Sequence, residues 1–238
     1  MTVDWSSWFP ANPLWGVLLT VGVYFLANRL FQKARQTPLL HPVLVSVLVI
    51  IGLLWWWELD YAAYMSGGQL IHFLLGPATV ALAWPLYQSW PTFKRCLWPV
   101  LVAVTCGILV GATSAIYLAA WLGASELTQL SLAPKSVTTP VAIVVSEQLG
   151  GLPALTAGFV IITGVVGAMF GAQIFRWMGV DDPRVSGLAM GVSAHGVGTA
   201  RAWQLDHTMG AYSGLGMGVA AVMVAFVLPP WLWLLGWL

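Results

Sequence analysis

A chain of 238 residues in which 59% are hydrophobic and only 7% are charged is not an ordinary soluble domain, where about a quarter of residues carry charge. Its formal net charge of +1 disfavours nucleic acid as a partner. Its two cysteines lack the spacing of a metal site or a disulfide framework. We therefore expect an all-α, polytopic integral membrane protein of one domain (residues 1–238), surrounded by lipid, with no metal and no cofactor.

Apolar stretches long enough to cross a hydrocarbon core of about 30 Å recur along the chain. They predict crossings at residues 14–30, 39 or 43–57, 69–87, 97–121, 152–177, 186–205 and 211–237, and an interrupted segment at 130–149. The basic cluster Arg29, Lys33 and Arg35 predicts a cytoplasmic first loop. Because the loop at 176–184 mixes arginine with aspartate, the sequence leaves open whether 130–149 crosses or turns back. We expect seven or eight transmembrane segments, some of them broken, as in transporters.

The most unusual stretch is Leu132–Ala142, which reads LAPKSVTTPVA and contains two prolines and a lysine. Pro134 and Pro140 each lack a backbone N–H and disfavour helix in the residue before them, so the helix should break between Ala133 and Pro140. Free peptide groups at membrane depth are tolerated only beside a cavity. Lys135 lies in this break, and an ionisable group there marks a binding site or pathway by default. The alternative is an interfacial loop with Lys135 reaching the lipid headgroups.

A second stretch, Leu75–Pro85, reads LGPATVALAWP and shares the order leucine, small residue, proline, any residue, hydroxyl, valine with Leu132–Val137. We expect a second broken helix at Gly76 and Pro77. Paired interrupted segments indicate the substrate site of a secondary transporter.

A third stretch, Ser193–Arg201, reads SAHGVGTAR and combines the flexible Gly196 and Gly198 with His195 and Arg201. Together with Lys135, these residues place positive charge in apolar segments that carry little acid. Such charge is unfavourable at depth, and a small anion would relieve it. We therefore expect an anion site. Its candidate ligands are Lys135, Arg201, His195, Thr79, Ser136, Thr138, Thr139, Ser193 and Thr199.

Each candidate role has a structural alternative. Arg201 suits a carboxylate because its guanidinium donates two parallel hydrogen bonds, but it could instead pair with Asp206 or Glu147. His195 could carry a coupled proton, or it could be a buried histidine bonded to a backbone carbonyl. The threonine hydroxyls at 138 and 139 could bond back to helix carbonyls.

No nucleophile, paired carboxylates or metal motif of an enzyme is assembled in the sequence, so we expect no catalytic residues. Three segments, LGPATVALAWPLY, LAPKSVTTPVA and GVSAHGVGTARA, closely resemble the signature segments of the LrgB/CidB family, which includes the membrane domain of the plant plastid glycolate/glycerate transporter.

This resemblance implies a bacterial cytoplasmic (inner) membrane protein that transports small monocarboxylates such as glycolate, glycerate or pyruvate. It also implies a partner, a small LrgA/CidA-type holin-like membrane protein, with a homodimer as a further expectation. The alternative function that it implies is an antiholin-like regulator of murein hydrolase export and cell lysis. A carrier is favoured because a pore has no evident need for broken helices and central cations.

Overall fold

The computed structural model describes residues 14–34, 37, 40, 42–81, 87 and 90–238, and these residues group into two compact units, 1–80 and 81–238. The described residues are helical or lie in turns and short connections, which confirms the all-α fold class. The expected single membrane domain over residues 1–238 stays a prediction.

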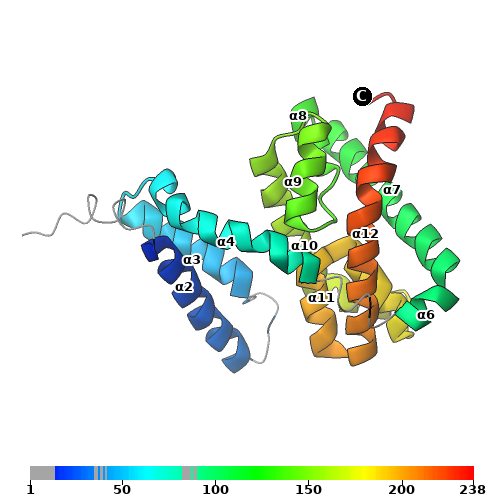
Figure 1. Cartoon of the computed structure of the whole chain (residues 1–238), viewed down its shortest axis with the longest axis horizontal. Helices are drawn as coiled ribbons and strands as arrows, with labels where there is room; N and C mark the ends of the chain where they lie inside the picture. The colour runs from blue at the N-terminus through cyan, green and yellow to red at the C-terminus, as the bar shows by residue number, and fades with distance from the viewer. Residues whose placement is uncertain (1–13, 35–36, 38–39, 41, 82–86, 88–89) are drawn as a thin grey trace, which may run out of the picture. The chain divides into compact units, whose positions relative to one another are not determined.

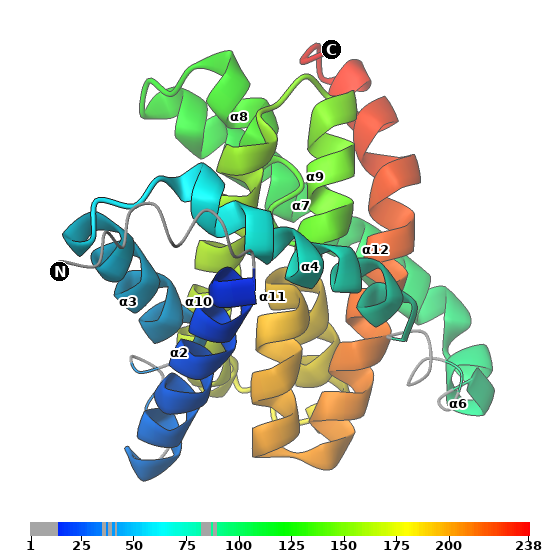
Figure 2. The same ribbon diagram turned by 60° about the vertical axis from the view of Figure 1, so that its left-hand side comes forward.

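The first unit contains α2 (Leu14–Lys33), α3 (Pro42–Trp56) and α4 (Tyr61–Ala81), with α2 and α3 side by side (Figure 2). The Thr20 hydroxyl and the Tyr64 hydroxyl lie 2.7 Å apart and join α2 to α4. The break expected at Gly76 and Pro77 is not present, because α4 continues through both residues to Ala81. Membrane helices tolerate a proline where other groups compensate the missing hydrogen bond.

The second unit is built from two long helices, each followed by a pair of shorter helices, and from a final long helix. Its helices are α6 (Trp90–Arg95), α7 (Leu97–Trp121), α8 (Glu126–Leu132), α9 (Thr139–Gln148), α10 (Pro153–Trp177), α11 (Pro183–Leu205) and α12 (His207–Leu234). Small residues set the close approach of these helices. A Cβ on Gly216 of α12 would lie 2.8 Å from the Leu188 carbonyl of α11.

Helices α8 and α9 form a hairpin, named here hairpin 1 (residues 126–148), which enters and leaves at the same end of the unit. The Thr156 hydroxyl near the start of α10 lies 2.9 Å from the Ser131 carbonyl of α8 and 2.6 Å from the Ser146 hydroxyl of α9. The Leu152 N–H, just before α10, donates a 2.7 Å hydrogen bond to the Ser131 hydroxyl of α8. The chain therefore returns after α9 to the level of α8, so the segment turns back instead of crossing. Figure 1 shows α8 and α9 at the end where α12 finishes.

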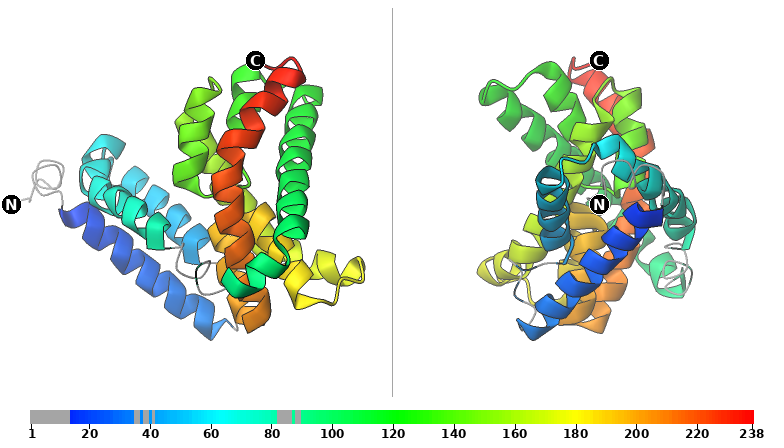
Figure 3. Two further views of the ribbon diagram at one scale, coloured as in Figure 1. Left: turned by 45° about the vertical axis from the view of Figure 1, so that its right-hand side comes forward. Right: turned by 90° about the vertical axis from the view of Figure 1, so that its left-hand side faces the viewer.

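Helix α11 is also a hairpin, named here hairpin 2 (residues 183–205). Its backbone reverses at His195, where φ is 41° and ψ is −136°. A Cβ on Gly198 would lie 3.1 Å from the Met190 carbonyl, an approach that a straight helix does not allow between residues eight apart. The prediction that 186–205 crosses the membrane is therefore wrong. Its two arms lie at the end opposite to hairpin 1 (Figure 3, left).

The two long helices with their hairpins form an inverted pair. Helices α7 and α10 are each 25 residues long, and each ends in tryptophan followed two residues later by a glycine of positive φ, Gly123 (80°) and Gly179 (67°). A capping side chain then opens each hairpin: Ser125 accepts a hydrogen bond from the Thr128 N–H, and Asp182 accepts one from the Arg184 N–H. Since the hairpins enter from opposite ends, the second helix and hairpin repeat the first in the opposite direction.

Asp182 also forms the salt bridge found among the described residues: its carboxylate lies 2.7 Å from Nη2 of Arg184. Hydrogen bonds from the Arg184 side chain and backbone lower the pKa of the Asp182 carboxyl to about 2. The alternative considered for Arg201, an ion pair with Asp206 or Glu147, is not found in the described part of the chain.

Four described helices are long and apolar enough to cross a membrane: α2, α7, α10 and α12. Helix α3 is apolar but shorter, at 15 residues. The structure therefore supports a membrane protein, while the expected count of seven or eight segments is not confirmed. Hairpin 2 accounts for part of the difference, because residues 186–205 were expected to supply one crossing, and hairpin 1 removes the eighth segment that the sequence left open.

Candidate functional site

The expected break in Leu132–Ala142 is confirmed, and it forms the tip of hairpin 1. Helix α8 ends at Leu132, residues 133–138 form turns, and α9 begins at Thr139 with Pro140 in its first turn. Proline fits there because the first helical N–H groups have no partner within the helix. Ala133 and Pro134 are buried, so the tip is part of the packed interior.

Lys135 lies at this tip, near the middle of α7. Its ammonium nitrogen donates hydrogen bonds of 3.3 Å to the Gly111 carbonyl of α7 and of 3.3 Å to the Ser136 hydroxyl. Gly111 is roughly ten residues from the end of α7 at Trp121, or about 15 Å along the helix axis. Both bonding partners are neutral, so in the described residues the ammonium has no carboxylate counterpart.

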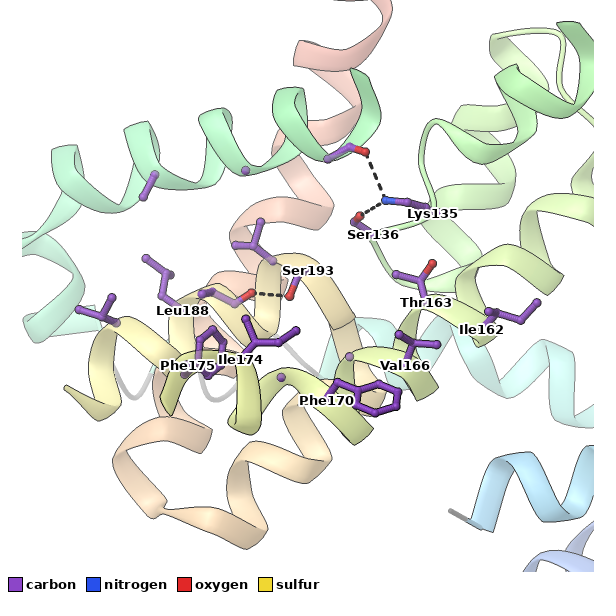
Figure 4. Close-up of a pocket in the computed structure, with 18 residues that line it drawn as sticks. Lys135, Ser136, Ile162, Thr163, Val166, Phe170, Ile174, Phe175, Leu188 and Ser193 are labelled. Atoms are coloured by element: carbon purple, nitrogen blue, oxygen red, sulfur yellow. Dashed lines mark hydrogen bonds between the residues drawn. The ribbon is translucent and has the colours of Figure 1, made fainter. Parts of the chain in front are cut away.

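A cavity of about 780 Å³ lies beside Lys135, between both hairpins and the two long helices. Lys135 and Ser136 contribute from hairpin 1, and Val192 and Ser193 contribute from hairpin 2 (Figure 4). The remaining lining residues are Ala103, Gly107 and Gly111 of α7; Ile162, Thr163, Val166, Gly167, Phe170, Gly171, Ile174 and Phe175 of α10; and Val185, Leu188 and Ala189 of α11. No carboxylate lines this cavity among the described residues.

The tip of hairpin 2 is held by buried polar contacts. The Nε2 of His195 lies 2.9 Å from the Val160 carbonyl of α10, so this nitrogen carries the proton and donates. The Thr199 hydroxyl lies 2.8 Å from the His195 carbonyl and 2.9 Å from the Ser213 hydroxyl of α12. These bonds agree with the structural alternative for His195, and they fix the reversal of the chain at this residue.

The structure brings together Lys135, Ser136 and Ser193 from the expected ligand set. Ser193 bonds back to the Ala189 carbonyl at 2.7 Å, as hydroxyls in membrane helices often do. Arg201 does not line the cavity, and its guanidinium donates to the Gln204 side chain at 3.1 Å.

The remaining expected ligands lie around the hairpin tips or in the other unit. Thr138 is buried with no hydrogen-bond partner for its hydroxyl among the described residues, and neither Thr138 nor Thr139 lines the cavity. Gly196 is exposed and Gly198 is buried, next to the reversal at His195. Thr79 lies in α4, and its side chain is outside the described part of the structure.

A buried cluster of hydroxyls in hairpin 1 was not predicted from the sequence. Ser131, Ser146 and Thr156 are each fully buried, and the Ser131 hydroxyl also accepts a 2.7 Å hydrogen bond from the Leu152 N–H. The cluster joins both arms to α10. Its sequence signal is weak, because three isolated hydroxyls in apolar segments more often bond to their own helix.

Comparison with known proteins gives one family and no solved structure. The profile of the LrgB-like family matches residues 20–234. The uncharacterized protein YwbG of Bacillus subtilis is 38% identical over 213 residues, covering 90% of this chain and 94% of that protein. The holin-like protein CidB of Staphylococcus epidermidis is 34% identical over 213 residues, covering 90% and 93%. No solved structure matches the chain significantly.

Proposed function

This chain belongs to the LrgB-like family, and we propose that it carries small monocarboxylate anions such as glycolate, glycerate or pyruvate across the bacterial cytoplasmic membrane. The observation that supports this most is the ammonium of Lys135, held at a hairpin tip beside the middle of the membrane-length helix α7, with neutral partners and next to a cavity. An uncompensated lysine at the centre of a membrane helix costs roughly 3 kcal/mol. A carboxylate that binds there compensates the charge and restores a charge-assisted hydrogen bond.

The inverted pair of hairpins supports transport in preference to simple binding. Hairpin 1 enters from one end of the second unit and brings Lys135 to the cavity. Hairpin 2 enters from the opposite end and lines the same cavity with Ser193. In alternating access, one group of helices moves against another around a fixed central site. In this proposal, movement of each hairpin opens the Lys135 cavity toward its own side of the membrane.

Uptake into proteoliposomes tests this proposal. Labelled pyruvate, glycolate and glycerate should enter saturably and compete with one another. Lys135→Met should lower the ratio of maximal uptake rate to half-saturation constant by about 10- to 100-fold, because a hydrogen bond to a charged group contributes about 1.5–3 kcal/mol. Lys33→Met is the matched control, since Lys33 is exposed at the end of α2 and should leave uptake unchanged.

The similarity to proteins named holin-like protein CidB favours a second candidate. In this candidate the chain is an antiholin-like regulator of murein hydrolase export and lysis, and it acts with an LrgA/CidA-type membrane protein. Such a regulator would change the rate of autolysis when expressed, and Lys135→Met would leave that change intact. Solute flux through a pore would rise linearly with concentration. Linear flux that is indifferent to Lys135 would exclude the carrier.

The proposed oligomeric state is a homodimer in lipid. Chemical cross-linking of the purified protein, with and without a co-expressed LrgA/CidA-type protein, distinguishes self-association from a complex of the two proteins.

A further inference from the structure

The cavity beside Lys135 has two chemically different ends. The first end holds the ammonium of Lys135 and the hydroxyls of Ser136 and Thr163, which lie on the same side in Figure 4, while Ser193 lies farther along, beside Leu188 and Ile174. The far end, around Ile174, Phe175 and Leu188 in Figure 4, is lined mainly by apolar side chains. It is open on one side, because the lining residues Phe170, Ile174 and Val185 are 50%, 43% and 53% exposed.

The apolar end extends well beyond the space that a two- or three-carbon acid needs. A cavity of about 780 Å³ falls within the range of roughly 300–1,000 Å³ that accommodates drug-sized ligands. Lining residues of hairpin 2 run from Ser193 to Val185, which is about two helical turns or ~12 Å.

Building on the proposed transport function, we propose that the substrates of this site include monocarboxylates with an apolar chain of about four to eight carbons, a length set by that ~12 Å. The carboxylate binds at Lys135 and Ser136, and the chain lies along hairpin 2 toward Ile174 and Val185. Hydroxyls on the distal carbons of a substrate gain nothing there, since the side chains of Ile174 and Val185 offer no hydrogen-bond partner and part of the water around the hydroxyl is lost.

A single small residue allows the far end to be filled without touching Lys135. Ala103 lines the cavity on α7, about two helical turns from Gly111, and is exposed. Ala103→Leu therefore adds bulk where the end of the chain would lie and should fold normally. Ala154→Leu is the matched control, because Ala154 is an exposed alanine of α10 that does not line the cavity.

The experiment is competition by straight-chain acids against labelled pyruvate in equilibrium counterflow, with equal pH on both sides so that no proton gradient is dissipated. Full burial of a methylene strengthens binding about fourfold, and half-burial in an open cavity about twofold. In the unmodified protein, the inhibition constant of hexanoate should therefore be about eightfold lower than that of propionate. In Ala103→Leu the two inhibition constants should be about equal. The Ala154→Leu protein should behave as the unmodified one.

Equal inhibition by propionate, hexanoate and glycerate would overturn the inference and leave the proposed transport intact. A gain with chain length that persists in Ala103→Leu, and grows further with palmitate, would overturn it as well, because it reports partition into the bilayer. If pyruvate is not transported at all, the proposed function fails. Stabilisation of the purified protein by hexanoate, absent in Ala103→Leu, would then still support the acid site.

Discussion

Removing one hydroxyl from the buried cluster of hairpin 1 should destabilise the protein measurably. Thr156→Val keeps the shape of the side chain and removes the group that meets the Ser131 carbonyl at 2.9 Å and the Ser146 hydroxyl at 2.6 Å. All three residues are fully buried, so the abandoned groups find no water. An unsatisfied buried polar group destabilises a protein by about 1–3 kcal/mol. Hydrogen bonds between membrane helices contribute on average about 0.6 kcal/mol and at most about 1.7 kcal/mol to stability. We expect a loss of about 1–2 kcal/mol.

The assay is the free energy of unfolding in mixed detergent micelles, compared with that of Thr105→Val. Within the described ranges the Thr105 hydroxyl bonds only to the Leu101 carbonyl of its own helix, at 2.7 Å, so its loss should change stability by less than about 0.5 kcal/mol. Pyruvate uptake should also fall in Thr156→Val, since the cluster positions the arm that carries Lys135. Equal losses of stability in the two variants would refute the structural role of this cluster.

Two further predictions concern hairpin 2. Gly164→Ala should destabilise the protein by about 1–3 kcal/mol, because the new Cβ would lie 2.6 Å from the His195 ring. Gly158→Ala is the control and should be neutral or stabilising, because its new Cβ would have no atom within 4 Å. The unfolding midpoints of the two variants check this prediction, and an unchanged midpoint for Gly164→Ala would contradict it. Hydrogen bonds from Arg184 lower the Asp182 carboxyl pKa to about 2, below its ordinary value near 3.9, so the charge of Asp182 stabilises the fold above about pH 4 and ceases to do so as pH falls toward 2. The stability difference between the unmodified protein and Asp182→Asn should therefore be constant above about pH 5 and vanish near pH 2 in a pH series of unfolding curves; a difference that does not change with pH would show that the charge is unimportant.

The sequence predicted those features of the site that depend on strong local signals. Pro134 and Pro140 remove backbone donors in a region that must otherwise be helical, so the break around Lys135 could be predicted before the fold was known. The same argument failed at Pro77, because a single proline inside an apolar helix can be tolerated without a break. The predicted helix break is therefore correct at Pro134 and Pro140 and wrong at Pro77.

The reversal at His195 could not be predicted in the same way. Glycines at 196 and 198 indicated an irregular helix, but the residue with positive φ is the histidine, a conformation uncommon for residues other than glycine. Contacts between distant residues, such as His195 with Val160, stabilise it, and they have no local signature. The expectation that Arg201 belongs to the site was wrong because it assumed that residues close to His195 in sequence face the same cavity. The reversal at His195 places Arg201 in the second arm, which does not line the cavity.

The central claim is that the Lys135 cavity binds a carboxylate and can be reached from opposite sides of the membrane through the two hairpins. Its most direct test replaces Cys96 and Cys106 with serine, introduces Ser136→Cys or Ser193→Cys, and measures labelling by an impermeant thiol reagent from each side of oriented vesicles. The account predicts that both positions are labelled from both sides as the protein cycles, and that pyruvate slows the labelling while a neutral analogue such as acetamide does not. Labelling from one side only, or at a rate that pyruvate leaves unchanged, would contradict it.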